Sequence, residues 1–251
     1  MANQLVNVEL FRAGIDERLG KNRKLTRFVD QESVEGLQVG TVNVVTNAYI
    51  GDATVVGAGV QIPLADMVQN QTPVKFEKLA KGVAVTDEEK RQKFGDPVGN
   101  AENQTVQAID GKAEAKLAEL LRGATFSIEA NALDSAALLD AIATMGEGIE
   151  DAPYFLVLTP AAYGELQKEV GMNFDLNNNP FGAEIVLSTR IEEGEAYLVQ
   201  EGAIKELVQK NVDVEVARNA GKKQDEIYTD LIHAVYIQDQ SKIVAIKTVG
   251  E

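Results

Sequence analysis

The chain has 251 residues, of which 45% are apolar and 25% charged, so it has the composition of an ordinary globular protein with room for one large domain or two smaller ones. It contains no cysteine, which excludes disulfides, thiolate nucleophiles and thiolate metal sites. The formal net charge of -15 makes the surface repel polyanions such as nucleic acids at long range.

The first 35 residues differ from the rest in their charge. Basic and acidic residues balance in this segment, so the whole excess of acid lies downstream. Apolar residues are scattered without a strong period. We expect an arm that is extended or partly helical and that needs a partner to become ordered.

A stretch without any Lys or Arg follows, from Phe28 to Val74. Within it, residues 41–50 are rich in β-branched side chains and predict a strand, and residues 74–86 predict a second strand. The connection between them is much longer than that of an ordinary hairpin, and loops of this length tend to carry function.

Two helix starts come next. Thr86 and Glu89 form a capping-box pattern, and Asp96-Pro97 combines an N-cap residue with proline at the first helical position. Apolar residues then follow at helical spacing up to Gly123. The pattern predicts one long, narrowly amphipathic helix over 97–122, about 39 Å in length.

The second half predicts an α/β unit followed by a β-rich tail. We expect helices over 135–145 and 160–170, strands over 154–158, 184–188 and 196–200, and a short helix over 203–210. The tail predicts a separate three-stranded meander over 212–217, 227–237 and 242–249.

No catalytic or cofactor motif accompanies these elements. Phosphate-loop, dinucleotide, zinc-protease and nucleophile-elbow patterns are all absent from the sequence. The single histidine, His233, lies in a predicted strand, where a packed structural role is favoured over that of a metal ligand or general base. Neighbouring carboxylates such as Glu192 and Glu193 are explained by solvated turns. The sequence therefore predicts neither an enzyme nor a cofactor.

The order of these elements resembles the major capsid proteins of tailed bacteriophages, which have the Hong Kong 97 fold that encapsulins share. The similarity covers nearly the whole chain in element order and is carried by diffuse segments. They are GTVNVVTNAYIGDA, VKFEKLAKGVAVTDEE, GDPVGNAENQTVQAIDGKAEAKLAELLRG, PYFLVLTPAAYGEL and VDVEVARNAGKKQDEIYTDLIHAVYIQDQSKIVAIK.

The resemblance implies an α+β fold with named parts. They are an N-terminal arm over 1–35, a first part of the peripheral P-domain over 36–123, an axial A-domain over 124–211 and a second part of the P-domain over 212–251. The first P-domain part would contain an extended E-loop within 49–74 and a spine helix over 97–122, and the second would carry a P-loop over 219–223.

The resemblance also implies a function in assembly. Copies of the chain would form the hexamers and pentamers of an icosahedral shell that encloses double-stranded DNA without sequence-specific binding. The shell would be assembled in the bacterial cytoplasm and would be the capsid of the virion. The expected partners are the chain itself, a separate scaffolding protein and a portal. The resemblance also allows a decoration protein, and it implies no membrane. Some family members link subunits through an E-loop lysine, but here the nearest lysine is Lys75 at the base of the loop, so we expect a non-covalent shell.

Three groups of residues are the candidates for contacts between subunits. The E-loop group combines two acids with apolar residues that an isolated loop cannot bury: Asp52, Val55, Val56, Val60, Ile62, Leu64, Asp66, Met67 and Val68. The arm group consists of bases expected to face the acidic E-loop of a neighbour: Lys21, Arg23, Lys24 and Arg27. The P-loop group is Asn219, Gly221, Lys222 and Lys223.

Two alternatives remain open at this point. An encapsulin-like compartment would share the fold but enclose a protein cargo. A small cytoplasmic α/β enzyme or ligand-binding protein would instead have a concave pocket with converging polar groups, and would fold the segment 50–74 onto its own subunit.

Overall fold

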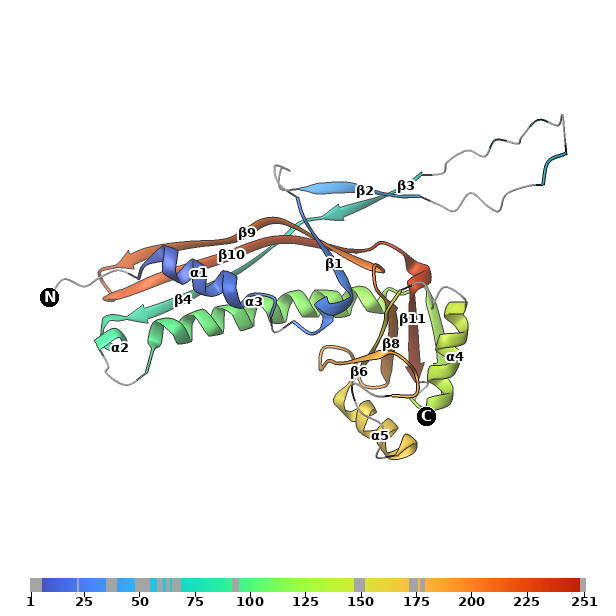
Figure 1. Ribbon diagram of the computed structural model, residues 1–251. Coiled ribbons are helices and arrows are strands. Elements are labelled where there is room, and N and C mark those ends of the chain that lie inside the picture. The colour runs from blue at the N-terminus through green and yellow to red at the C-terminus, as the bar shows by residue number, and fades with distance from the viewer. Residues whose placement is uncertain are drawn as a thin grey trace.

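The structure is a computed structural model that describes residues 6–21, 23–34, 40–47, 55–57, 61, 64, 69–91, 95–146, 152–171, 176 and 179–248. It contains two sheets and a two-stranded ribbon (Figure 1). The long sheet has the order β1-β9-β10-β4, with β1 at Val29–Ser33, β9 at Ile204–Asn219, β10 at Gln224–Ile237 and β4 at Glu77–Thr86. The body sheet has the order β5-β11-β8-β6-β7, with β5 at Phe126–Ala130, β11 at Ile243–Thr248, β8 at Glu195–Gln200, β6 at Tyr154–Leu158 and β7 at Glu184–Leu187. The ribbon pairs β2 at Thr41–Asn47 with β3 at Gln69–Lys75.

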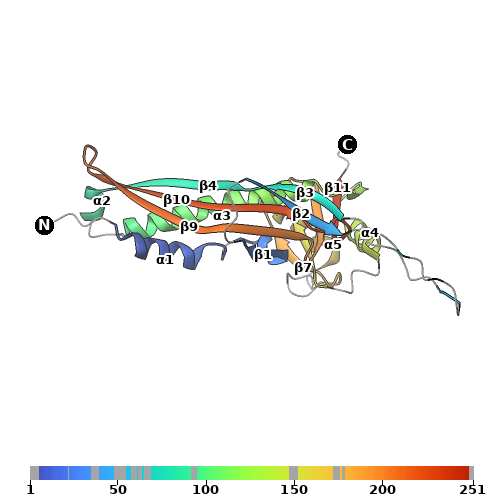
Figure 2. The ribbon, with the colours of Figure 1, turned by 90° about the horizontal axis from the view of Figure 1, so that it is seen from above.

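The long helix predicted over 97–122 is confirmed as α3, Pro97–Arg122. Asp96 caps it by accepting a hydrogen bond from the Gly99 backbone N–H at 3.0 Å. The apolar stripe of α3 lies under the long sheet, where Ile109 packs with Leu79 of β4 and Leu231 of β10. Seen from above, β4, β10 and β9 run lengthwise over this helix (Figure 2). The helix and the long sheet therefore form two layers of an elongated unit.

The arm is partly helical, as expected. Helix α1 covers Val8–Arg18, and a 3-10 turn, η1, covers Leu25–Phe28 before the chain enters β1. Phe11 and Ile15 of α1 are fully buried against α3 and the long sheet. Strand β1 pairs in parallel with β9 from Val29↔Ile204 to Ser33↔Val208. The described part of the arm, residues 6–21 and 23–34, is thus docked on its own subunit, and the expectation that it needs a partner to become ordered is wrong for this part.

The body sheet is covered on both faces. Helices α4 (Ser135–Met145) and α5 (Pro160–Val170) pack on one face, with Leu138 and Leu166 against Leu156 and Leu198. The last turns of α3 and the η1 turn pack on the other face, with Leu121 and Phe28 against Val157 and Val199. This explains why β6, β8 and β11 are apolar at successive positions rather than at alternate ones.

Two predictions about the second half are wrong. Residues 203–210 do not form a helix but begin β9, because pairing with β1 and β10 overrides the helical propensity of Leu, Glu and Lys. The tail is not a three-stranded meander, because only β9 and β10 pair with each other. Strand β11 turns away at the 3-10 turn η3 (Gln240–Lys242) and lies between β5 and β8 of the body sheet. The run Ile243–Ile246 is buried throughout, which an exposed meander could not provide.

The far end of the long sheet is held by an ionic cluster that we call the tip cluster: Asp87, Lys90, Arg218 and Asp225. Arg218 donates to both oxygens of Asp87, at 2.7 and 2.5 Å, and to Asp225 at 2.9 Å, and Lys90 donates to the second oxygen of Asp225. The Val6 backbone N–H also donates to Asp225, at 3.2 Å. Asp225 therefore ties together β9, β10, the short helix α2 (Asp87–Arg91) and the first described residue of the arm.

The electrostatics of this cluster follow from burial and pairing. Burial by itself would raise the pKa of Asp225, whose side chain is only 1% exposed, but the hydrogen bonds from Lys90 and Arg218 outweigh it and hold this pKa below its usual value.

The capping box predicted at the start of α2 is confirmed, since Thr86 and Glu89 exchange hydrogen bonds at 2.8 and 3.2 Å. The bonds that the Thr86 backbone N–H and hydroxyl donate to the Glu89 carboxylate lower the pKa of Glu89.

Replacing the cap residue Asp96 by alanine should lower the free energy of unfolding by about 0.5–2 kcal/mol, because the Gly99 N–H loses its acceptor. The measurement is chemical denaturation at equilibrium. The control is Gln107→Ala, an exposed position in the middle of α3, which should leave the stability nearly unchanged. Equal effects of both substitutions would contradict the role of the cap.

Replacing Asp225 by asparagine should lower the free energy of unfolding at pH 7 by roughly 1.5–3 kcal/mol, because charged hydrogen bonds to Lys90 and Arg218 are lost. The folded-state pKa of Asp225 is lowered, so its contribution is complete above the unfolded value of about 4 and is lost as the pH falls further. The difference between wild type and variant should therefore shrink in acid. Asp16→Asn, which removes a half-exposed pair with Arg12 at 3.7 Å, is the control and should cost less than about 1 kcal/mol.

Candidate assembly surfaces and the arm anchor

The β2–β3 ribbon joins the rest of the subunit at its base. Its base is fixed where Val74 and Phe76 pack with Leu207 and Tyr236 of the long sheet. Beyond that base the ribbon projects away from the body (Figure 1). Val55 is fully exposed and Leu64 is 93% exposed, so two apolar side chains of the predicted E-loop group have no cover within their own subunit.

The rest of the E-loop group is described only in part. Val56 is half-buried. Asp52, Val60, Ile62, Asp66, Met67 and Val68 lie outside the described residues. Thr72, Pro73 and Val74 line a cleft at the base of the ribbon, but the exposure of Val55 and Leu64 counts against the alternative in which the whole segment 50–74 folds onto its own subunit.

The four bases of the arm group have different surroundings. Lys21 and Lys24 are exposed, and Lys21 lies 3.7 Å from Glu17 on the same arm. Arg27 forms an ion pair with Glu184 of β7 at 2.6 Å, at the surface. Arg23 is buried and makes ion pairs with Asp110 and Glu206 of its own chain. The expectation that Arg23 faces a neighbouring subunit is therefore wrong, because its guanidinium is already enclosed and paired.

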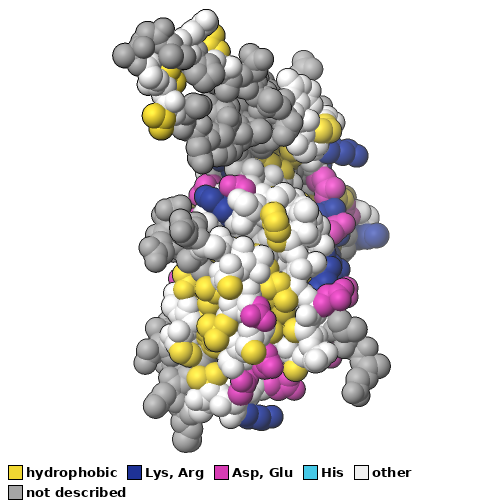
Figure 3. Space-filling model, turned by 90° about the vertical axis from the view of Figure 1, so that its right-hand side faces the viewer, with side chains coloured by type: hydrophobic (Ala, Val, Ile, Leu, Met, Phe, Trp, Pro, Cys, Tyr) yellow, Lys and Arg dark blue, Asp and Glu magenta, His cyan; other side chains and the backbone are white. Residues whose placement is uncertain are grey.

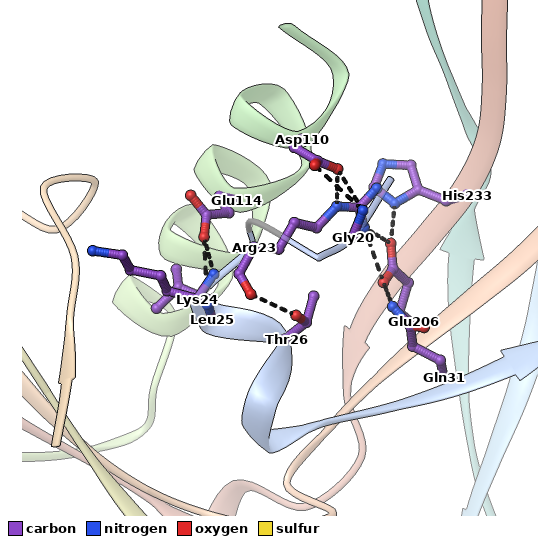
Figure 4. Close-up of polar contacts among 10 residues, drawn as sticks. All are labelled: Gly20, Arg23, Lys24, Leu25, Thr26, Gln31, Asp110, Glu114, Glu206 and His233. Atoms are coloured by element: carbon purple, nitrogen blue, oxygen red, sulfur yellow. Dashed lines mark hydrogen bonds and ion pairs between the residues drawn. The ribbon is translucent and has the colours of Figure 1, made fainter. Parts of the chain in front are cut away.

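Arg23 belongs to a cluster that we call the arm anchor, whose members are buried except for the exposed Gln31: Arg23, Gln31, Asp110, Glu206 and His233 (Figure 4). The Arg23 Nε–H donates to Asp110 of α3 at 2.6 Å, and Nη1 donates to Glu206 of β9 at 3.1 Å. The His233 Nδ1 of β10 lies 2.7 Å from Glu206, and the Gln31 side chain of β1 donates to the other oxygen of Glu206 at 2.8 Å. Three strands and the arm loop converge on the Glu206 carboxylate, and α3 joins them through Asp110 and Arg23.

Glu206 is ionised in this environment. Burial by itself would raise its pKa, but the hydrogen bond with His233 and the positive charge of Arg23 outweigh burial and hold this pKa below its usual value. Two further carboxylates of α3 fix the backbone around Arg23. Asp110 accepts from the Gly20 N–H at 3.2 Å, and Glu114 accepts from the backbone N–H of Lys24. The anchor thus fixes the path of the arm loop over α3.

The prediction that His233 is a structural residue is consistent with this geometry. Its side chain is 2% exposed, and its Nδ1 lies 2.7 Å from Glu206, a carboxylate that Arg23 and Gln31 also contact. Among the described residues, no group of three or more His, Asp or Glu side chains is placed to hold a metal ion. Sequence reasoning missed the anchor because Arg23, Asp110, Glu206 and His233 are far apart along the chain and no short motif joins them.

The predicted P-loop group forms the turn between β9 and β10. Asn219 accepts a hydrogen bond from the Lys222 backbone N–H at 3.1 Å and donates from its amide to Glu226 at 2.8 Å. Lys223 has a positive φ of 49°, and its carbonyl accepts from the Asp87 N–H at 3.0 Å. Gly221 and Lys222 are exposed at the end of the turn. The turn is therefore bonded to Asp87 of the tip cluster, while the side chains of Lys222 and Lys223 are exposed.

A further exposed apolar surface lies on the body. Apolar side chains gather on the face seen from the right of Figure 1 (Figure 3). Helix α4 carries a single charged residue, Asp140, and its Leu139 is 56% exposed. This helix is apolar on the side that packs against the body sheet and also partly on the side that faces outward.

A cleft with a volume of about 1040 Å³ lies between the base of the ribbon, the end of α3 and the end of β10. Its wall includes charged side chains that are already paired, with Lys116 lying 3.3 Å from both Glu77 and Glu119. No helix among the described residues is long and apolar enough to cross a membrane.

The comparisons with known proteins agree with this architecture. The family described as "Phage capsid protein" matches residues 68–245. A curated relative, the "Major capsid protein" of Staphylococcus phage phiMR11, is 29% identical over 260 residues, which cover 98% of this chain and 94% of the relative.

Solved capsids share the fold at low identity. The capsid of a native GTA particle has a TM-score of 0.74 at 12% identity, and the match covers 92% of each chain. The capsid of cyanophage P-SCSP1u has a TM-score of 0.72 at 9% identity, with 90% of this chain and 88% of that chain covered. The virus-like particle of Pyrococcus furiosus has a TM-score of 0.70 at 16% identity, with 96% and 99% covered.

These findings identify the fold as the Hong Kong 97 type and the protein as a structural one rather than an enzyme. The encapsulin alternative is not favoured, because the family and the curated relative are both phage capsid proteins. With its long helix under a long sheet, its projecting ribbon and its covered body sheet, the chain belongs to the phage capsid protein family.

Proposed function

We propose that copies of this chain form the hexamers and pentamers of an icosahedral phage head that encloses double-stranded DNA. One observation carries the proposal: a folded subunit leaves Val55 fully exposed and Leu64 93% exposed in the segment that connects the two strands of the projecting ribbon. Apolar side chains in such a position are covered when another copy of the chain packs against them. The acidic surface supports enclosure of DNA without tight binding, since a net charge of -15 repels the phosphate backbone.

The parts of the subunit have distinct roles in this assembly. The ribbon and its loop reach a neighbouring subunit, the body with its exposed α4 meets other copies around the capsomer axis, and the turn at Gly221 and Lys222 meets copies at the far end. Segment 49–74 contains no lysine, so the contacts are non-covalent. A separate scaffolding protein guides the assembly, and a portal occupies one vertex.

Replacing Val55 and Leu64 together by serine should prevent or weaken assembly without unfolding the subunit, because neither side chain is buried in its own chain. Burying Val or Leu contributes about 1.5–3 kcal/mol each, so the concentration needed for assembly should rise tenfold or more. Electron microscopy and light scattering measure assembly, and thermal unfolding of the unassembled chain measures the fold.

The control for this pair is Gln61→Ser, an exposed polar position in the same segment. It should assemble like the wild type. Normal shells from the double variant would sink the proposal that this segment is an assembly contact, whereas a lowered thermal midpoint would point to a role within the subunit.

The exposed bases Lys21 and Lys24 remain the candidates for pairing with the acidic loop of a neighbour. Lys24→Glu should raise the concentration needed for assembly, and adding Asp66→Lys should restore it by reversing both charges. Lys112→Glu, an exposed base on α3, makes the same charge change elsewhere and serves as the control. Failure of the double reversal to improve on Lys24→Glu would reject this pairing, and a surface pair of this kind contributes only ~0–1 kcal/mol per contact.

A further inference from the structure

The two broad faces of the elongated unit differ in charge. We call the side of the long sheet that lies away from α3 the sheet face. Glu215 lies opposite the half-exposed Tyr228, and directly opposed residues of neighbouring strands point to the same face. Asp230, two residues further along β10, points the same way and lies opposite Asp213. The sheet face therefore presents four acids and a lysine that is paired with one of them at 2.7 Å: Asp213, Glu215, Glu226, Asp230 and Lys78.

One side of α3 carries no acid between Asn100 and Ala115. At spacings of three and four residues it presents amides, small residues and one lysine, at positions that are all exposed or half-buried. We call it the amide strip: Asn100, Gln104, Gln107, Ala108, Gly111, Lys112 and Ala115. The strip is about 22 Å long at 1.5 Å per residue. It lies on the other side of the helix from Ile109, which packs under the long sheet.

The acids of α3 in this span are turned to the arm. Each of the three contacts a basic residue of the arm through its side chain or its backbone: Glu102 with Arg18 at 3.2 Å, Asp110 with Arg23 at 2.6 Å, and Glu114 with the backbone N–H of Lys24. The docked arm therefore occupies these acids, and the amide strip beside them contains no negative charge.

Arg190 adds a second base to the strip. It belongs to the turn that follows β7, and its Nη2 lies 2.8 Å from the position that a Cβ would take at Gly111. The glycine thus lets the guanidinium lie directly against the helix. Both Arg190 and Lys112 are exposed, and neither forms an ion pair with a residue that the structure describes.

The other charged groups around the strip lie at its two ends and along the arm. Most of them have partners: Glu89 with Thr86 at 2.8 Å, Asp96 with the Gly99 N–H at 3.0 Å, Glu119 with Lys116 at 3.3 Å, Glu192 with Arg122 at 3.0 Å, Arg27 with Glu184 at 2.6 Å and Lys21 with Glu17 at 3.7 Å. Glu193, in the turn of Arg190, and Lys24, on the arm, are exposed and opposite in charge. The positive charge of the strip is therefore centred on Gly111, between its acidic ends.

This strip matches the chemistry of a nucleic-acid backbone. Double-stranded DNA carries one negative charge per about 1.7 Å of its axis, and a surface with a net charge of -15 repels it at long range. Lys and Arg side chains, and the amides of Asn and Gln, donate hydrogen bonds to phosphate oxygens without reading the sequence. The amide strip offers these donors, whereas the sheet face presents carboxylates.

We propose that the amide strip, together with Arg190, is the surface on which each subunit touches the phosphate backbone of double-stranded DNA inside the shell, while the sheet face is turned away from the DNA. The inference rests on the proposed function, because it takes the enclosed molecule to be DNA. Lys112 and Arg190 supply two positive charges per copy, so each contact is weak and the contacts of many copies add up.

The first experiment compares DNA-filled heads with the same heads after their DNA has been released. Acetic anhydride, which is small enough to enter a shell, is applied briefly, and the acetylation of each lysine is measured by mass spectrometry. Lys112 should react several-fold more slowly in filled heads, because DNA covers it. Lys78, on the sheet face, is the internal control and should react equally in both.

A matched pair of variants isolates the charge. Lys112→Gln combined with Arg190→Gln removes both bases of the strip but keeps donors for hydrogen bonds. Filled heads of this variant should release their DNA at a lower temperature, as reported by a DNA-binding dye, and added salt should narrow the difference from wild type because it screens phosphate contacts. Lys78→Gln combined with Lys81→Gln makes the same charge change on β4 and should release DNA as the wild type does. Shells assembled without DNA leave this face of α3 uncovered, so Lys112→Glu stays a suitable control for assembly.

The outcomes separate this inference from the proposed function. Equal reactivity of Lys112 in filled and emptied heads would overturn the inference while the shell function stands. So would protection of Lys78 in place of Lys112, or equal release temperatures for the two double variants. If the strip variant forms no filled heads, the acetylation of wild-type heads still decides. A chain that forms no DNA-filled shell at all would instead contradict the proposed function itself.

Discussion

The pairing of β9 with β10 is the interaction on which the other parts of the subunit depend. Strand β9 runs from Ile204 at the body to Asn219 at the tip, and β10 returns to Ile237 beside the body. The arm strand β1 attaches to β9, β4 attaches to β10, and α3 packs beneath. The chain continues from β10 into β11, so the long sheet and the body sheet are joined by consecutive strands. Loss of this pairing would leave the arm, the helix and the ribbon without a common support.

Local signals in the sequence predicted most of the elements. Asp96, Pro97 and Gly123 predicted both ends of α3, and Thr159 with Gly171 did the same for α5, because caps depend on residues within one turn. Segment 203–210 was misread because its helix-forming residues are overruled by two neighbouring strands that lie far away in the sequence. The placement of β11 was missed for the same reason. The spacing of apolar residues shows which face of a segment can be buried. The sheet that the segment joins is decided by strands that lie far away in the sequence.

The assembly surfaces were partly predictable. A long loop with apolar residues and no base already indicated a contact with another copy, and the structure leaves Val55 and Leu64 uncovered. The role of Arg23 could not be predicted, because arm bases look alike in the sequence. Only the fold brings Asp110 and Glu206 to Arg23, while leaving Lys24 at the surface. The chain as a whole carries an excess of acidic residues, and two of them, Asp110 and Glu206, are buried where Arg23 neutralises their charge.

The irregular part of the β9–β10 ladder lies beside this cluster. Asp230 faces Asp213, but Ile232 faces Lys210 and His233 faces Val208, so β9 contains one extra residue at each step. A shift of one strand by a single residue would turn each of its side chains to the opposite face of the sheet. A slip of β10 would carry His233 out of the interior, and a slip of β9 would carry Glu206 out and leave Arg23 enclosed with Asp110 alone. The charged cluster consequently selects one alignment of the two longest strands. The apolar residues around it could not do so alone, because one apolar side chain can take the place of another.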